Sequence, residues 1–221
     1  MLNNGALKFE LASLKGFNAK YNLSGDGILH TDYPQMKIIA GVNDFNLADY
    51  ASSVGARGVK DGKGTLTFQY SMNGNRLSHF VDNGTVDFTA DVSGLIVDRN
   101  AFADSFSRYL RKYIASVDLS ACTISQGGVA FHQTGENGFI QKFSLMSDRG
   151  NISGFGKYSY EKGLSVNGEF STTGPVSSTG AGGLFASAPF DITGTLAKPV
   201  FSIRVKNGDP KKTDGFRLWS L

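Results

Sequence analysis

The sequence predicts a mainly β protein: one curled antiparallel sheet, either groove-like or a partly open barrel, with one or two short amphipathic helices. Short segments alternate apolar and polar residues and are bounded by Gly, Asn or Pro, as in antiparallel strands joined by tight turns. The chain has 28 glycines against 5 prolines, which indicates turns and strand bends rather than disorder. Only two segments change to helical spacing, so helices are expected to be a minor component.

Period-two alternation predicts the strands of the first half of the chain. They are expected at residues 6–11, 36–43, 65–72 and 86–92, whereas residues 21–30 are expected to contain a turn. The pattern is clearest in the third of these strands, where every second residue is a large apolar one. Turns are predicted at residues 25–27, 73–75 and 83–84, which read Gly-Asp-Gly, Asn-Gly-Asn and Asn-Gly. Residues 57–64 are predicted to form a polar Gly/Lys loop.

Two segments have helical rather than strand spacing. The shorter one, residues 44–54, is expected to be capped at Asp44 or Asn46 and to end by Gly55. The longer one, residues 98–116, carries one apolar stripe. Its polar side holds the cations Arg108, Arg111 and Lys112. Such a helix usually packs on a sheet, and the alternative is that it rests on anionic lipid headgroups.

The β pattern resumes after the second helix and continues to residue 206. Strands are expected around Ile124, Val129 and Phe131, and over residues 139–146, 150–160 and 165–170, and two more, separated at Lys198-Pro199, are expected within residues 188–204. In the first of the longer segments, Phe139, Gln141, Phe143 and Leu145 are predicted to share one face. Residues 177–183 are rich in Ser and Gly and are predicted to form a flexible link. We therefore predict one β domain over residues 1–206, with residues 207–221 as a tail or truncated continuation.

Composition and motifs argue against several function classes. A net charge of +3 is too small to indicate a nucleic-acid partner. Cys122 is the only cysteine, which excludes an intrachain disulfide, and it is interpreted as a small buried hydrophobe. No nucleophile elbow or P-loop is present, so no catalytic residue, cofactor or metal site is predicted. Paired carboxylates that only the fold brings together, as in glycosidases, are the remaining enzymatic alternative.

The three histidines and the hydropathy add two further expectations. His30, His79 and His132 lie in separate segments with no carboxylate or cysteine at ligand spacing, so structural or surface roles are predicted. No stretch approaches the roughly twenty apolar residues of a transmembrane helix. The N-terminus also lacks the pattern of a signal peptide. The chain is therefore expected to be either cytosolic or a piece of a longer, membrane-targeted protein.

Three motifs occur in a fixed order along the chain. The first is the short helix followed by Gly-Lys-Gly-Thr-Leu-Thr-Phe at residues 62–68. The second is a Gly-Thr-Val strand with a Val-Ser-Gly-Leu turn at residues 84–95, leading into the longer helix. The third is Gly-Phe-Gly at residues 154–156, with a closing element at residues 189–199. In this order the motifs resemble the C-terminal region of AsmA-like bacterial envelope proteins, and the resemblance covers most of the chain.

The resemblance implies a non-enzymatic lipid-handling module that holds phospholipid acyl chains in an apolar β-trough during inner-to-outer membrane lipid transport and outer-membrane biogenesis. It implies a periplasmic location, as part of a protein anchored in the inner membrane by a helix absent from this sequence. The expected partners are a phospholipid or other acyl lipid and envelope proteins. The expected trough residues are Leu66, Phe68, Tyr70, Val86, Phe88, Val92, Phe143, Leu145, Tyr158, Tyr160 and Phe170.

Three alternatives remain open at this point. The apolar faces of the strands also suit an ordinary closed core. The runner-up function is a structural or assembly module that binds protein partners in outer-membrane biogenesis. A carbohydrate-active enzyme is the third reading, and it requires clustered carboxylates in a polar cleft.

Overall fold

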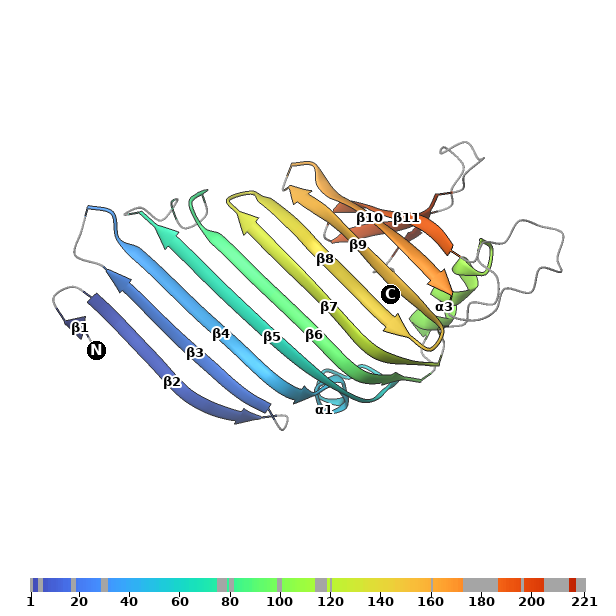
Figure 1. The fold of residues 1–221 in the computed structure, drawn as a ribbon, viewed down its shortest axis with the longest axis horizontal. Helices are drawn as coiled ribbons and strands as arrows, with labels where there is room; N and C mark the ends of the chain where they lie inside the picture. Colours follow the sequence, from blue (N-terminus) through green and yellow to red (C-terminus); the bar gives the residue numbers. More distant parts are fainter. Residues whose placement is uncertain are drawn as a thin grey trace.

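One open antiparallel sheet makes up most of the molecule. The computed structural model describes residues 2–3, 6–16, 19–28, 32–74, 79, 82–98, 101–113, 119, 121–159, 161–172, 187–195, 197–204 and 215–217. Within them, thirteen strands form a single sheet in which the spatial order of the strands equals their order in the sequence (Figure 1). The sheet is not closed into a barrel. The predicted mainly β, open antiparallel fold is therefore confirmed.

The described elements have the following bounds. The strands are β1 (Leu2–Asn3), β2 (Ala6–Gly16), β3 (Ala19–Ile28), β4 (Gln35–Asn46), β5 (Val59–Asn73), β6 (Thr85–Val97), β7 (Cys122–Thr134), β8 (Asn137–Ser147), β9 (Gly150–Ser159), β10 (Gly163–Thr172), β11 (Ser187–Thr195), β12 (Lys198–Ile203) and β13 (Phe216–Arg217). The helices are α1 (Leu47–Ser53), between β4 and β5, and α3 (Ala101–Leu110), between β6 and β7.

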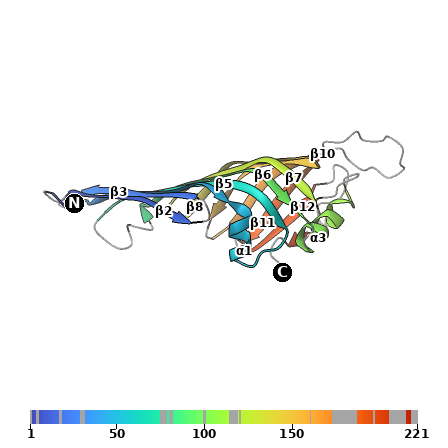
Figure 2. The same cartoon turned by 90° about the horizontal axis from the view of Figure 1, so that it is seen from below.

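The sheet is bent along its length. It is nearly flat at β2 and β3 and curls toward β10, β11 and β12, with α1 and α3 on the inner side of the bend (Figure 2). We call this side the inner face and the opposite side the outer face. Side chains alternate between the two faces along each strand, and residues directly opposite each other on neighbouring strands lie on the same face.

The register of the strands gives the sheet one apolar and one polar face. A continuous row of paired residues crosses the sheet from β3 to β12: Leu23, Ala40, Phe68, Phe88, Phe131, Ile140, Gly156, Val166, Ile192 and Phe201. This row lies on the inner face, where Phe201 packs beneath α3. The adjacent outward row contains Thr67, Thr89 and Lys142. The alternation read from the sequence therefore extends across the whole sheet.

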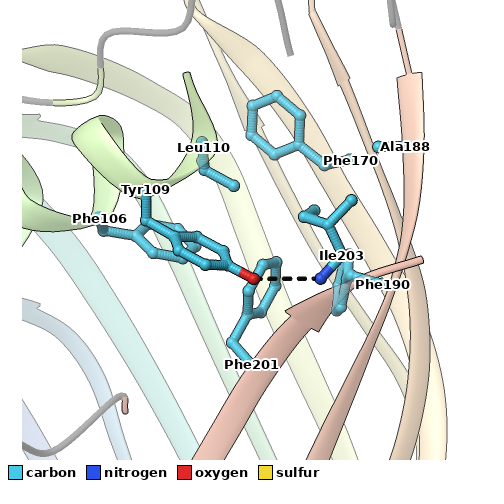
Figure 3. Close-up of a cluster of buried hydrophobic side chains, with 8 residues drawn as sticks. All are labelled: Phe106, Tyr109, Leu110, Phe170, Ala188, Phe190, Phe201 and Ile203. Carbon is cyan, nitrogen blue, oxygen red and sulfur yellow. Dashed lines mark hydrogen bonds between the residues drawn. The ribbon is translucent and has the colours of Figure 1, made fainter. Parts of the chain in front are cut away.

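The largest buried cluster lies between α3 and the last strands (Figure 3). Its buried members are Phe106, Tyr109 and Leu110 of α3, Phe170 of β10, Ala188 and Phe190 of β11, and Phe201 and Ile203 of β12. The backbone N–H of Ile203 donates a hydrogen bond of 3.3 Å to the Tyr109 hydroxyl. The apolar stripe of α3 thus packs on the curled end of the sheet, as amphipathic helices usually do.

The predicted turn at Gly25-Asp26-Gly27 is wrong, because all three residues lie inside β3. Gly25 pairs with Phe9 of β2, and a Cβ added at Gly25 would meet the Phe9 ring. The same arrangement recurs where Phe45 covers Gly64, Phe143 covers Gly154 and Phe190 covers Gly168. These glycines leave room for an aromatic ring from the neighbouring strand rather than for a chain reversal.

Two other predicted irregular segments also belong to strands. The predicted loop at residues 57–64 is wrong from Val59 onward, where β5 begins, and the Val-Ser-Gly-Leu turn lies within β6. Gly62 and Gly94 have positive φ angles of 134° and 59°, and the pairing of β5 with β6 shifts register in this region. Glycine therefore permits local irregularity here while the two long strands continue through it.

The predicted face of Phe139, Gln141, Phe143 and Leu145 is wrong for the first two residues. The pairing of β8 shifts between Ile140 and Phe143 against both of its neighbours, so β8 contains a bulge. Phe143 pairs with Val129 and Ile140 pairs with Phe131, which places Ile140 on the inner face. The extra residue leaves Phe139 on the outer face, where it is 49 % exposed.

The helices and the C-terminal segment differ from the prediction in their bounds. The N-cap of α1 is Asn46, whose Oδ1 accepts a hydrogen bond of 2.9 Å from the Asp49 N–H, so this predicted cap is confirmed. The predicted helix at residues 98–116 is helical over 101–110, and residues 114–118 lie outside the described part of the chain. Phe216 and Arg217 of the predicted tail form β13 beside β12.

Candidate functional site

An apolar hollow lies on the inner face at β3, β4, β5 and β6. Its volume is about 420 Å³. It is lined by Tyr21, Asn22, Leu23, Ala40, Gly41, Val42, Leu66, Phe68 and Phe88. Asn22 and Gly41 alternate with the inward-facing residues, and the Asn22 amide lies over Gly41 on the outer face. Apart from the Tyr21 hydroxyl, the inward-facing side chains that line the hollow are therefore hydrocarbon. The hollow therefore offers dispersion contacts and almost no hydrogen-bonding groups to an occupant.

Two cross-strand rows build the floor of the hollow. In one, Ala40 of β4 pairs with Leu23 on one side and with Phe68 on the other, and Phe68 pairs with Phe88. In the other, Val42 is paired between Tyr21 and Leu66. Ala40 is a small residue between two large ones, so the sheet surface is lower at this position than at its neighbours.

The hollow differs from the core in the exposure of its aromatic side chains. Phe68 is 37 % exposed, whereas Phe170 and Phe190 beneath α3 are each 1 % exposed. Leu66 and Phe88 are half-buried. The same inner face is therefore a closed core at its curled end and an open apolar surface near its flat end.

The helix α1 packs beside the hollow. A buried cluster of Ala19, Val42 and Phe45 has Leu47, at the start of α1, packed against it, together with the hollow residues Tyr21 and Leu66. The rings of Phe45 and Tyr50 meet edge to face, with centroids 6.1 Å apart and an interplanar angle of 81°. This cluster fixes α1 against the inner face and bounds the hollow on that side.

The predicted trough residues lie on one face of the sheet, but they do not come together in a single site. Every member that the structure describes lies on the inner face, and Leu66, Phe68 and Phe88 line the hollow. Tyr70 and Val86 pair with each other in the next row and are half-buried. Burial raises the pKa of the Tyr70 hydroxyl above its ordinary value.

The remaining predicted trough residues lie away from the hollow. Val92, Leu145 and Tyr158 are half-buried on the same face, and Tyr160 lies outside the described residues. The Phe143 ring packs against Phe190, with centroids 6.2 Å apart, and so belongs to the rim of the α3 cluster. Phe170 is inside that cluster.

Sequence reasoning missed the contribution of β3 and β4 to the hollow. Tyr21, Leu23, Ala40 and Val42 line it, although none of them was among the expected trough residues. A signal was present in the sequence, since Tyr21 and Leu23 alternate with Asn22, and Ala40 and Val42 lie in the predicted strand at residues 36–43. Nothing in the sequence indicated that these two strands would lie next to Phe68.

The cations of the predicted membrane-surface helix face away from the sheet. Arg108, Arg111 and Lys112 are exposed, whereas Phe106, Tyr109 and Leu110 are buried. The Lys112 Nζ lies 6.0 Å from the centroid of the Tyr109 ring. The apolar side of α3 is therefore used by the core, and only its charged side is available to a partner.

One histidine has a carboxylate partner that the sequence did not reveal. His132 of β7 pairs with Asp87 of β6, and Nδ1 of His132 lies 2.6 Å from Oδ1 of Asp87. Nε2 of the same ring lies 3.2 Å from the Thr134 hydroxyl. The histidine and aspartate side chains are 33 % and 48 % exposed. In such an exposed position this arrangement connects β6 to β7 and contributes little stability, on the order of 1 kcal/mol or less.

Two further findings concern metals and membranes. Over the described ranges, no three or more His, Cys, Asp or Glu side chains are grouped so that they could hold a metal ion. Neither α1 nor α3, the two helices among the described residues, is long and apolar enough to cross a membrane.

Comparisons with protein-family models, with curated proteins and with solved structures find no match to this chain. The resemblance to AsmA-like proteins therefore stays a prediction from the sequence, and the function is argued from the geometry of the sheet.

Proposed function

We propose that this chain is a non-enzymatic lipid-handling module of the bacterial cell envelope, and that the hollow on its inner face holds an acyl chain. The observation that carries the proposal is the apolar hollow of about 420 Å³ lined by Leu66, Phe68 and Phe88. An acyl chain needs no hydrogen-bond partners, so a hydrocarbon-lined surface suits it. Each methylene that leaves water for such a surface contributes about 0.8 kcal/mol.

The distribution of polar groups also supports an amphipathic ligand. The hollow is open to solvent, with Phe68 37 % exposed, so a charged headgroup can stay in water while the hydrocarbon tail is covered. Among its lining residues, Tyr21 has a hydroxyl on an inward-facing side chain, whereas the Asn22 amide faces outward. The proposed context is periplasmic transport of phospholipid between the inner and outer membranes, with an anchor in a longer parent protein.

The first experiment is native mass spectrometry of the gently purified chain, with lipid extraction in parallel. We expect a phospholipid or fatty acid to copurify in stoichiometric amount. A mass without lipid, unchanged after incubation with phospholipid vesicles, would contradict the proposal. The binding of cis-parinaric acid, a fluorescent fatty acid, then gives a dissociation constant for the hollow itself.

A pair of variants locates the binding. Phe88→Asp places a carboxylate in the hollow, whereas Thr89→Asp places the same group next to it in the chain but on the outer face. We expect Phe88→Asp to weaken binding of cis-parinaric acid at least tenfold, which corresponds to about 1.4 kcal/mol. Thr89→Asp is expected to bind like the unmodified protein. An equal loss of folding and binding in Phe88→Asp would instead place Phe88 in a packed core.

A second candidate function is supported by the first edge of the sheet. From Phe9 to Gly16, β2 pairs with β3 and with no other described strand. An open edge of this length is suited to pairing with a strand of another protein. A structural or assembly module is therefore the alternative proposal. It predicts that a protein partner, and no lipid, accompanies the purified chain.

A further inference from the structure

We propose that the outer face of the sheet binds an oligosaccharide in a shallow depression centred on Phe155 of β9. The depression spans β8 to β12 and has a volume of about 830 Å³. Its chemistry differs from that of the hollow, because amide, carboxylate and cationic side chains surround a single exposed ring. This site lies on the opposite face from the acyl-chain hollow, so the inference does not depend on the proposed function.

Phe155 points outward because of its neighbours in β9. A Cβ added at Gly154 would meet the Phe143 ring, and one added at Gly156 would meet Val166, so both positions face inward. The residue between them must face outward. Phe155 is 63 % exposed, although phenylalanine is among the residue types that are most often buried in folded proteins. Its ring therefore contributes little to the core and is available to a ligand.

The bulge in β8 brings two polar side chains to one side of this ring. Ile140 and Phe143 both face inward, so Gln141 and Lys142 between them both face outward. In a regular strand, one of these two consecutive residues would point into the apolar face. Bulges commonly reorient a side chain in this way near functional sites. Here the bulge places an amide and an ammonium group beside Phe155.

On the other side of the Phe155 ring, β10 and the residue that follows β12 contribute further polar side chains to the depression. Asn167 of β10 pairs directly with Phe155, and Glu169 follows two residues later on the same face. Arg204 also lines the depression, and its Nε lies 3.1 Å from Oδ2 of Asp191. The side chains around the ring thus include hydrogen-bond donors, acceptors and amides that serve as both.

The balance of charge and polarity favours a saccharide over other ligands. The positive charges of Lys142 and Arg204 are offset by Glu169 and by the partner carboxylate Asp191, so a phosphate gains little net attraction. A lipid tail would leave these polar groups without partners. A sugar ring presents an apolar C–H face that stacks on an aromatic ring, while its hydroxyls exchange hydrogen bonds with amides and carboxylates.

A second depression extends the surface toward β6 and indicates a ligand longer than one sugar. It has a volume of about 230 Å³ and is lined by residues that include Thr89, Asp91, Gln126, Ser144 and Lys142, the last of which also lines the first depression. With neighbouring strands about 4.8 Å apart, the distance along the sheet from β6 to β12 is roughly 29 Å. Asp91 and Glu169 lie in separate depressions, so neither depression contains a carboxylate pair among the residues that line it. The inference is therefore one of binding.

The test is a titration of the isotope-labelled chain, followed by nuclear magnetic resonance, with three tetrasaccharides as probes: chitotetraose, cellotetraose and maltotetraose. We expect at least one of them to shift the backbone amides of β8 to β11, and not those of β3 and β4. The proposal is overturned if no tetrasaccharide shifts these amides. It is also overturned if an unrelated peptide or a phospholipid vesicle perturbs them and the tetrasaccharides do not.

Variants of Phe155 distinguish stacking from general apolar contact. Phe155→Ala and Phe155→Leu are expected to weaken binding of the active tetrasaccharide at least tenfold, whereas Phe155→Tyr keeps the aromatic face and the affinity. Tyr33→Ala is the control, because Tyr33 is an aromatic residue that is 71 % exposed near the start of β4. Equal affinity of Phe155→Leu and the unmodified protein would contradict the stacking role. All four substitutions are at exposed side chains and are expected to leave the circular dichroism spectrum unchanged.

Discussion

The Tyr109 hydroxyl accepts a hydrogen bond from the backbone N–H of Ile203, a residue 94 positions later in the chain. Both residues are buried, and the Tyr109 ring also meets the Phe201 ring edge to face, with centroids 6.1 Å apart. The bond joins α3 to β12, which is the last strand but one among the described residues. The contact helps to hold α3 over the curled end of the sheet, which is a closed core, whereas the flatter strands carry the open apolar hollow.

Replacing Tyr109 with Phe removes this hydrogen bond and keeps the ring. We expect Tyr109→Phe to lower the free energy of unfolding by about 1 kcal/mol, because the Ile203 N–H is left without a partner inside the core. Urea unfolding followed by circular dichroism measures the change. Tyr33→Phe, at a position that is 71 % exposed, is the control and should be neutral. Equal stability of both variants would show that the bond contributes nothing.

The pairs of glycine and aromatic residues predict where the sheet does not accept a side chain. Gly168→Ala would place a Cβ against the Phe190 ring and 2.6 Å from the backbone oxygen of Ser153. We expect a loss of about 1 to 3 kcal/mol in unfolding free energy, since the backbone cannot move away as freely as a side chain. Ser165→Ala, an exposed position on the same strand, adds no volume and is expected to change the free energy little. A neutral Gly168→Ala would contradict the proposed role of the ring.

The strands themselves were predictable because alternation is a local property of the sequence. Leu66, Phe68 and Tyr70 follow one another on one face as the period-two pattern requires. The N-cap of α1 was equally local, since Asn46 and Asp49 are three residues apart. For these elements, the residues that decide the structure lie within a few positions of each other.

The features that the sequence did not reveal depend on residues in neighbouring strands. Gly25 was predicted to be a turn residue because glycine is common in turns. Its actual role, which is to leave room for the Phe9 ring, depends on a residue of the neighbouring strand. Likewise, the bulge in β8 is visible only in its register with β7 and β9. The contrast between buried Phe170 and exposed Phe68 was also hidden, since it depends on where α3 packs. The alternation places both residues on one face but does not say what covers that face.

The thiol of Cys122 is expected to react slowly. Partial burial raises its pKa, the nearby Asp148 carboxylate raises it further, and Arg149 acts in the opposite direction. Because the thiolate is the reactive form, alkylation by iodoacetamide at pH 8 should be slower than for a cysteine in a short peptide, with its midpoint at a higher pH.

Asp148→Asn tests the electrostatic part of this explanation. The Asn side chain keeps an oxygen that can accept the hydrogen bond of 2.9 Å from the Thr123 N–H, so the local structure should persist. Removing the negative charge is expected to lower the pKa of Cys122 and to speed its alkylation at pH 8. An alkylation profile that does not move with this substitution would leave burial as the whole cause.

Filling the hollow provides the most direct test of whether its space is used. Ala40 lies between Leu23 and Phe68 at the floor of the hollow, so Ala40→Leu adds apolar atoms where the structure has empty volume. We expect the unfolding free energy to stay the same or rise by about 1 kcal/mol, as in other cavity-filling substitutions. Binding of cis-parinaric acid should fall at least tenfold, because the side chain occupies the place of the ligand.

Thr67→Leu is the control: it adds a similar group on the outer face and is expected to leave binding unchanged. If Ala40→Leu instead destabilises the protein by more than about 2 kcal/mol, the position is already packed, and the acyl chain must bind elsewhere.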